Sequence, residues 1–106
     1  MTKNGPQFTI GIEEEYLLVD RETRSLVVDP PASLMAECEE LCGAQVTSEL
    51  LRSQIEIGTK VCENIQEAEE DLRRLRRIII DCAANHGLAP IAASTHPFSR
   101  WSEQKQ

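Results

Sequence analysis

The sequence predicts an α+β fold in which a mixed or antiparallel sheet carries helices on one face. Residues 8–19 alternate apolar and polar side chains with a period of two, which is typical of a strand. Residues 66–85 repeat apolar side chains at intervals of three and four, which is typical of an amphipathic helix. The early connections are short enough for hairpins and the later ones are longer, so a sheet covered by helices on one side is favoured.

The first predicted strand contains GIEEEYLLVD, in which three consecutive glutamates interrupt an apolar pattern. Alternation places Glu13 and Glu15 on one face of the strand and Glu14 on the other, together with Ile12 and Tyr16. A carboxylate is costly to bury unless it is paired, protonated or bound to a metal ion. The three glutamates therefore raise the question of what compensates their charge.

Further elements follow along the chain. RETRS is expected to form a turn, and residues 26–28 a short return strand that completes a hairpin. Asp29, which precedes two prolines, predicts the start of a helix that ends at Gly43. An extended segment is expected over residues 45–59, broken near residues 52–53.

The long helix is predicted for residues 66–85, with Asn64 as its N-cap and Glu67 as the capping-box partner. Gly87 predicts its end, and residues 88–93 are interpreted as a buried strand that leads into a loop, STHPFSRW. The apolar stripe of the helix consists of Ile65, Ala68, Leu72, Leu75, Ile79 and Cys82.

An arginine cluster lies on the same helix. Glu69 and Glu70 precede the first two arginines by four residues, a spacing that allows ion pairs along a helix. We therefore expect the whole cluster on the solvated face rather than in a phosphate site. Its members are Arg73, Arg74, Arg76 and Arg77.

Composition limits the class of protein. The 106 residues suit one domain, with residues 1–7 and 102–106 expected to be flexible tails. Eighteen acidic and eleven basic residues give a net charge of -7, which argues against a nucleic-acid or membrane surface and suits a protein that handles cations. The N-terminus lacks the apolar core of a signal peptide, and no stretch approaches the ~20 apolar residues of a membrane span, so we expect a cytoplasmic protein.

Four cysteines complete the inventory of reactive side chains. They show no C-x-x-C spacing, and we expect reduced, buried thiols that act as small apolar groups, with redox or metal roles as the alternative. They are Cys38, Cys42, Cys62 and Cys82.

The acidic residues are the candidates for a metal site. Two glutamates at i and i+2 on a strand project side by side about 7 Å apart and can bind a divalent ion. Glu13 and Glu15 have this spacing, although a solvated edge-strand face would show it too. Glu56 lies between two isoleucines, and Glu49 is nearby in sequence. If the two strands are neighbours, Glu56 joins the first pair in a cluster that repels itself without cations, and hard oxygen ligands suit Mg²⁺ or Mn²⁺.

Three segments together resemble a known family. GIEEEYLLVD, SELLRSQIEIGTKVC and ASTHPFSRW, which extend from about Phe8 to Trp101, are similar to the N-terminal part of the YbdK-like carboxylate-amine ligases, the glutamate-cysteine ligase type 2 family. The resemblance implies a glutamine-synthetase-like catalytic fold of which this chain is the N-terminal portion. It also implies ATP-dependent chemistry, in which a carboxylate is phosphorylated to an acyl phosphate and an amine then forms an amide.

The resemblance also implies roles for individual residues. Glu13 and Glu15 correspond to metal ligands, Glu56 to a further ligand, and Glu49 to an acidic neighbour. His96, in THPF, would orient substrate or phosphate, unless it is a loop residue hydrogen-bonded to the backbone. Ser94 stands where a glycine or another small residue is expected.

The implied partners are ATP, an amino-acid-like carboxylate and an amine. Family members are longer than this chain, which is therefore expected to be a poor catalyst alone and to associate as a homo-oligomer or with a complementary ligase chain. The alternative is a non-catalytic oligomerisation or partner-binding module derived from the same fold.

Overall fold

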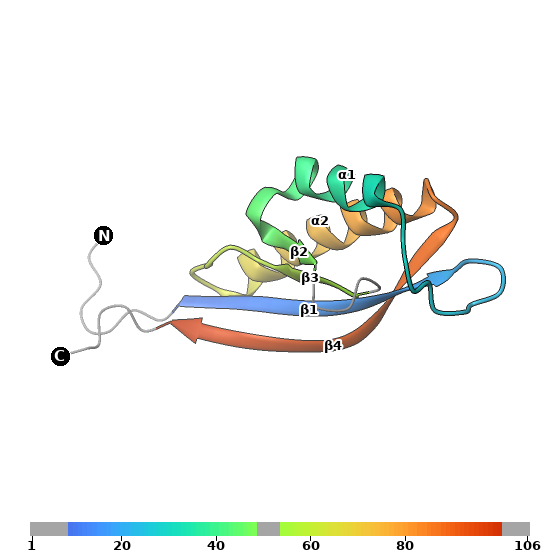
Figure 1. Cartoon of the computed structure of the whole chain (residues 1–106). Coiled ribbons are helices and arrows are strands. Elements are labelled where there is room, and N and C mark those ends of the chain that lie inside the picture. Colours follow the sequence, from blue (N-terminus) through green and yellow to red (C-terminus); the bar gives the residue numbers. More distant parts are fainter. Residues whose placement is uncertain (1–8, 49–53, 101–106) are drawn as a thin grey trace, which may run out of the picture.

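A four-stranded sheet carries two helices on one face in the computed structural model, which describes residues 9–48 and 54–100 (Figure 1). Every pair of neighbouring strands is antiparallel, in the order β2-β3-β1-β4. The α+β prediction is confirmed, with an antiparallel rather than a mixed sheet. The elements are β1 (Thr9–Asp20), α1 (Ala32–Cys42), a 3-10 turn (Gly43–Gln45), β2 (Val46–Ser48), β3 (Gln54–Gly58), α2 (Ile65–Ala84) and β4 (Leu88–Arg100).

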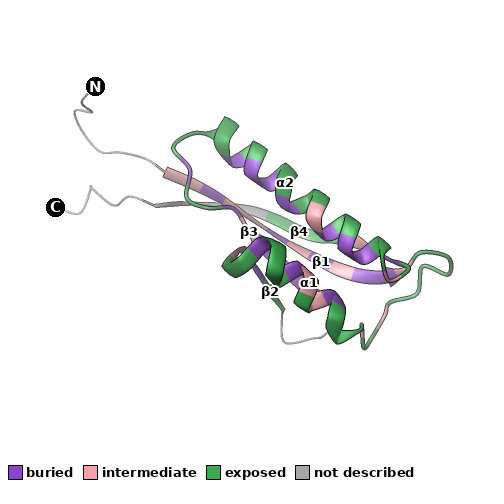
Figure 2. Cartoon of the chain, turned by 90° about the horizontal axis from the view of Figure 1, so that it is seen from above, coloured by how far each residue is buried: buried purple, intermediate pink, exposed green. Residues whose placement is uncertain are grey.

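The core lies between the sheet and the helices, and the buried residues of both helices face the strands (Figure 2). The predicted stripe of α2 is buried from Ala68 to Cys82, whereas Ile65, at its start, is 61% exposed. The principal core side chains are Tyr16 and Leu18 of β1, Leu34 and Cys38 of α1, Ile55 and Ile57 of β3, and Leu72, Leu75 and Ile79 of α2.

The ends of α2 follow the sequence prediction. The side chain of Asn64 accepts a hydrogen bond from the Glu67 N–H at 2.8 Å, and the Glu67 carboxylate accepts one from the Glu63 N–H at 2.9 Å. The first bond satisfies a donor that the helix itself leaves unpaired, and the second holds the residue that precedes the N-cap. Beyond the other end, Gly87 adopts a positive φ of 72°, which glycine tolerates without steric cost.

The start of α1 differs from the prediction. Pro31, in an extended conformation, precedes the first helical residue, Ala32, and no side chain caps the helix. Asp29 is too far upstream, because a capping side chain must reach N–H groups two or three residues ahead of it. Gly43 ends the helix with a φ of 62°, as predicted.

The predicted hairpin after β1 is reduced to a turn and a single bridge. The Asp20 carboxylate accepts hydrogen bonds from the N–H groups of Glu22 and Thr23 at 2.8 and 2.9 Å, which closes the turn. Residues 26–28 form no strand, and only the bridge between Val19 and Leu26 remains. Of the three apolar residues in this segment, Val27 packs against the core, whereas Leu26 and Val28 are exposed.

The prediction that STHPFSRW forms a loop was wrong for its described residues, because β4 continues as one strand from Leu88 to Arg100. It pairs with β1 along its length, with an irregularity between Glu15 and Tyr16. The expected burial of residues 88–93 holds for Leu88, which is 6% exposed, but not for Ile91, which is 49% exposed, and β4 lies at the edge of the described sheet. Proline residues within it suit an edge position, where a missing N–H costs no ladder bond.

The four cysteines are buried and form no disulfide, as expected. Burial, together with its neighbours Cys82 and Cys42, raises the pKa of the Cys38 thiol to about 12, so this side chain is an apolar group rather than a nucleophile. Neither helix in the described part of the chain is long and apolar enough to cross a membrane.

Candidate functional site

Three of the predicted glutamates share the face of the sheet opposite α1 and α2, which we call the helix-free face. Glu15 pairs directly with Glu56 on β3, and Glu13, two residues earlier, pairs with Gly58. Residues directly opposite each other in an antiparallel ladder have side chains on the same face. The two strands are therefore neighbours, which is the condition under which Glu56 was expected to join the first pair, and we call these three glutamates the acidic face.

β4 borders the acidic face on the other side of β1. The Ser94 hydroxyl donates a hydrogen bond to Oε1 of Glu15 at 3.1 Å, and the backbone register pairs His96 with Glu13. His96 thus belongs to a strand next to β1 rather than to a loop. On the opposite side, Glu13 and Glu56 line a shallow hollow of about 280 Å³ together with Thr47 on β2.

The acidic face is not a closed metal centre. Among the side chains described in residues 9–48 and 54–95, no three His, Cys, Asp or Glu are gathered closely enough to hold an ion. Glu49 lies outside the described residues. The carboxylates present are hard oxygen donors of the kind that Mg²⁺ and Mn²⁺ prefer, so the chemistry of the donor set fits while the set is incomplete.

Glu14, between the other two glutamates in sequence, is buried on the helix side of the sheet with 1% of its surface exposed. Arg76 of α2 donates to both carboxylate oxygens, with a distance of 2.9 Å from its Nε to Oε1. The Thr95 hydroxyl of β4 donates to Oε2 at 2.9 Å, and the Tyr16 hydroxyl donates to Oε1. These residues form the Glu14 network, and they explain how a carboxylate is accommodated inside the core.

The electrostatics of the Glu14 network favour the ionised carboxylate. Burial by itself raises the pKa of Glu14, but the hydrogen bonds from Arg76, Tyr16 and Thr95 outweigh burial and hold the pKa below its ordinary value. Burial and the adjacent carboxylate raise the pKa of Tyr16, which stays a neutral donor. The network therefore consists of one anion, one cation and two neutral hydroxyl donors.

A second buried carboxylate, Asp71, lies in the N-terminal half of α2. Its oxygens accept hydrogen bonds from the Lys60 N–H at 3.0 Å, from Nε2 of Gln45 at 2.9 Å and from Nε of Arg74 at 3.1 Å. Burial raises the pKa of Asp71, but these donors outweigh it and lower the pKa overall. Asp71 thus fastens the helix to the segments around β2 and β3.

All four arginines of the cluster are exposed, as predicted, but two of them pair with buried carboxylates that the sequence did not reveal. Arg73 pairs with Glu69 at 3.6 Å on the surface, as predicted. Arg74 and Arg76 instead pair with the buried Asp71 and Glu14. The helical spacing contains a signal for this, because residue 76 follows Leu72 by four positions and therefore borders the apolar stripe.

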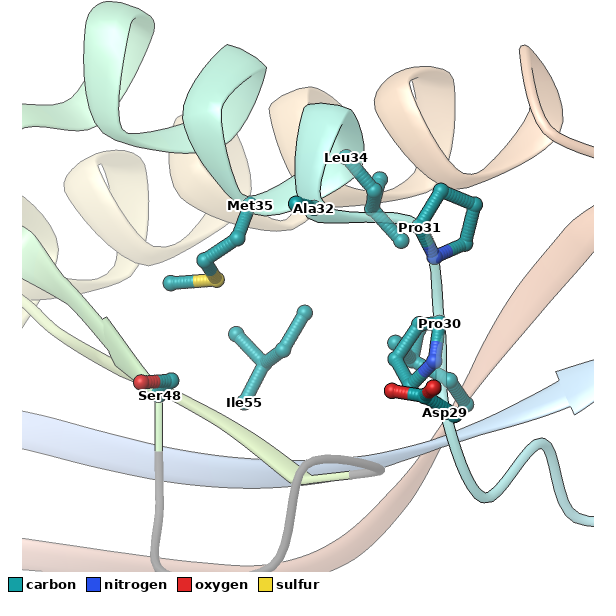
Figure 3. A pocket seen from close by; sticks show the side chains of 9 residues that line it. Asp29, Pro30, Pro31, Ala32, Leu34, Met35, Ser48 and Ile55 are labelled. Carbon is teal, nitrogen blue, oxygen red and sulfur yellow. The ribbon is translucent and has the colours of Figure 1, made fainter.

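A separate pocket of about 540 Å³ opens between the first turn of α1 and β3 (Figure 3). Leu34 and Met35 of α1 and Ile55 of β3 supply much of its apolar lining, with Asp29 at one side. None of the acidic-face glutamates is among the described residues that line it. The pocket therefore lies on the helix side of the sheet, away from the candidate site.

Comparison with known proteins identifies the family. Residues 9–106 match the model of the glutamate-cysteine ligase family 2. Similar proteins, each of which carries glutamate-cysteine ligase 2 as a provisional name, occur in Rhodospirillum rubrum, with 55% identity over 94% of this chain, and in Jannaschia sp., with 50% over 97%. A relative in Solibacter usitatus is 42% identical over 99% of the chain. The chain spans 27% of the length of each of these three relatives. On these matches, the chain belongs to glutamate-cysteine ligase family 2.

Proposed function

We propose that the chain is the N-terminal portion of an ATP-dependent carboxylate-amine ligase with a glutamine-synthetase-like catalytic fold. Membership in the glutamate-cysteine ligase family 2 supports the reaction class. The observation that carries the site is the register of β1 and β3, which sets Glu15 opposite Glu56 with Glu13 beside them.

The proposed metal ligands are Glu13, Glu15 and Glu56, with Glu49 as an acidic neighbour. Like charges directly opposite each other on neighbouring strands destabilise a sheet, and a divalent cation offsets that repulsion. Mg²⁺ keeps several water molecules and is usually bound through a few carboxylates plus substrate phosphates. Three carboxylates on a rigid strand pair are a suitable protein contribution to such a site.

The proposed reaction has two steps. A carboxylate oxygen of the acid attacks the γ-phosphorus of ATP, and ADP leaves to give an acyl phosphate. The amine nitrogen then attacks the acyl carbon, phosphate leaves with the bonding electrons, and the nitrogen loses a proton. Glu13, Glu15 and Glu56 would hold the Mg²⁺ or Mn²⁺ ion, which would supply positive charge to offset that of the phosphate groups.

The residues of this chain hold and orient groups in that reaction. The glutamates of the acidic face supply oxygen ligands, and the Ser94 hydroxyl orients the Glu15 carboxylate. His96, next to Glu13 in the ladder, is proposed to orient substrate or phosphate. The proposed substrates are ATP, an amino-acid-like carboxylate and an amine, for which cysteine is one candidate. The proposed compartment is the cytoplasm, because it supplies ATP.

The chain needs further segments to complete this chemistry, because three carboxylates without a nucleotide pocket cannot bring the reacting groups together. A complementary ligase chain or a second copy would supply them. The exposed edge of β4 supports the second candidate function, a non-catalytic module that associates through this edge.

A chimera tests the ligase proposal. The chain replaces the matching segment of the Rhodospirillum rubrum relative, which is 55% identical to it. Amide formation from glutamate, cysteine and ATP is followed by mass spectrometry together with ADP release, and Mn²⁺ binding is followed by electron paramagnetic resonance. We expect ADP and amide in equal amounts, and a loss of Mn²⁺ affinity of at least about 10-fold in Glu15→Gln and Glu56→Gln.

The matched control is Glu40→Gln, which removes the same charge from an exposed position on α1. It should leave Mn²⁺ affinity and amide formation unchanged. An active parent relative combined with an inactive chimera would contradict the ligase proposal. Equal behaviour of Glu15→Gln, Glu56→Gln and Glu40→Gln would contradict the metal site and favour the non-catalytic module.

A further inference from the structure

The Glu14 network joins three elements directly behind the acidic face. Glu14 lies between Glu13 and Glu15 on β1, and its carboxylate is held by Arg76 of α2 and by Thr95 of β4. Each contact therefore links the central residue of the acidic stretch to a different neighbour in the fold. The side chains of this network lie on the helix side of the sheet, opposite the proposed metal ligands. The network can therefore affect the positions of those ligands only through the backbone of β1.

The contact of Glu14 with Thr95 depends on the register of β1 against β4. Thr95 stands opposite Glu14, and the preceding residue of β4, Ser94, stands opposite Glu15. The register shifts between Glu15 and Tyr16, so this stretch of the ladder lies next to an irregularity where pairing could slip. A slip by one residue would exchange the two faces of the strand and break both the Thr95–Glu14 and the Ser94–Glu15 hydrogen bonds.

Stability alone does not account for the network. A buried ion pair usually stabilises a protein no more than well-packed apolar side chains of similar size. Arg76 does, however, compensate the central charge in a run of three carboxylates. The negative charge of Glu14 is thereby prevented from adding to the repulsion within the acidic face.

We propose that Glu14 and Arg76 are positioning residues for the acidic face: they fix the register of β1 against β4, so that Glu13 and Glu15 project together from the helix-free side. This inference rests on the proposed function for its link to metal binding. The placement of the strands can be tested without a metal ion.

The central test removes both charges at once. The variants are Arg76→Met, the double variant Glu14→Leu/Arg76→Met and the control Arg73→Gln, all made in the 106-residue chain. Unfolding in urea measures stability, nuclear Overhauser effects between Glu15 and Ser94 report the strand register, and electron paramagnetic resonance measures Mn²⁺ affinity.

We expect the double variant to recover most of the stability that Arg76→Met loses, because two apolar side chains replace a broken ion pair. Its cross-strand signals between Glu15 and Ser94 should nevertheless weaken or disappear. Its Mn²⁺ dissociation constant should rise about 10-fold, as is typical when a residue that orients a metal ligand is removed. Arg73→Gln should match the wild type in all three measurements.

A stable double variant with wild-type cross-strand signals and wild-type Mn²⁺ affinity would overturn the positioning role. If the double variant does not fold, Glu14→Gln, which keeps the shape of the side chain, is judged by the same two readouts. If the wild type binds no Mn²⁺, or if Glu15→Gln leaves its affinity unchanged, the proposed metal site fails, and the register signals still decide the positioning role.

Discussion

Glu14 and Asp71 are both buried carboxylates paired with an arginine of α2, but their pairs differ in range. Arg74 follows Asp71 by three residues on the same helix, whereas Arg76 is 62 residues away from Glu14. The first pair can form within an isolated helix. The second forms only after α2 has packed on β1, so it depends on the tertiary fold.

The geometry of the two pairs differs as well. Arg76 reaches both oxygens of Glu14 in a forked arrangement, which is the stronger and more directional form of the contact. Arg74 directs Nε and Nη2 to a single oxygen of Asp71, and Asp71 also accepts a backbone N–H from Lys60. The burial of the Glu14 charge is therefore compensated by its arginine to a greater extent than the burial of the Asp71 charge is.

Replacing each arginine by methionine would measure this difference. Arg76→Met leaves Glu14 buried without a cation, and we expect a loss of about 3 kcal/mol in the free energy of unfolding, the low end of the range because Arg76 is half exposed. Arg74→Met should cost about 1–2 kcal/mol, because Asp71 keeps two other donors. Urea unfolding at neutral pH gives both values, and equal costs would show that the forked geometry contributes nothing extra.

We expect Asp71 to contribute to the pH dependence of the free energy of unfolding. Because its pKa is lower in the folded than in the unfolded chain, the ionised Asp71 stabilises the fold above about pH 4, and this stabilisation is lost as the pH falls through the folded pKa. Asp71→Asn should cost about 1–2 kcal/mol at pH 7. The difference in free energy of unfolding between this variant and the wild type should become smaller as the pH falls towards 2.

Asp81→Asn is the control for this titration, because Asp81 is an exposed acid on the same helix. At pH 7 its free energy of unfolding should differ from that of the wild type by no more than about 0.5 kcal/mol. If the free energies of unfolding of Asp71→Asn and the wild type differ by the same amount from pH 7 to pH 2, the lowered pKa of Asp71 is contradicted. Urea midpoints at closely spaced pH values provide the measurement.

Periodicity was sufficient to predict β1 and α2, because each has one continuous apolar face and α2 also carries a side-chain cap. It placed Glu14 on the core side of β1 correctly. It could not name Arg76 as the partner, because a pairing across 62 residues is decided by how the helix packs on the sheet. The glutamates four residues before Arg73 and Arg74 correctly predicted an exposed cluster, but Arg74 pairs with Asp71 three residues before it on the same helix.

The second half of β4 was missed for a different reason. Small residues and Pro97 are typical of a loop, and the two strand-favouring residues of STHPFSR, Thr95 and Phe98, are too few to outweigh them. The strand exists because β1 is long enough to pair with it from Leu88 to Arg100. The acidic face was predictable as a set of glutamates, whereas its border with Ser94 depends on this tertiary pairing.

Among the three ion pairs compared, the surface pair of Arg73 and Glu69 is expected to contribute least to the free energy of unfolding. Both side chains are largely exposed and their charged atoms are 3.6 Å apart, so solvent screens the attraction. Arg73→Gln should change the free energy of unfolding by no more than about 0.5 kcal/mol, and the change should shrink further in high salt. A loss as large as that of Arg76→Met would mean that the charge balance of α2 as a whole, and not the burial of Glu14, determines how much each arginine contributes. A small loss would leave burial of the carboxylate as the feature that distinguishes Arg76 from its neighbour three residues earlier on the same helix.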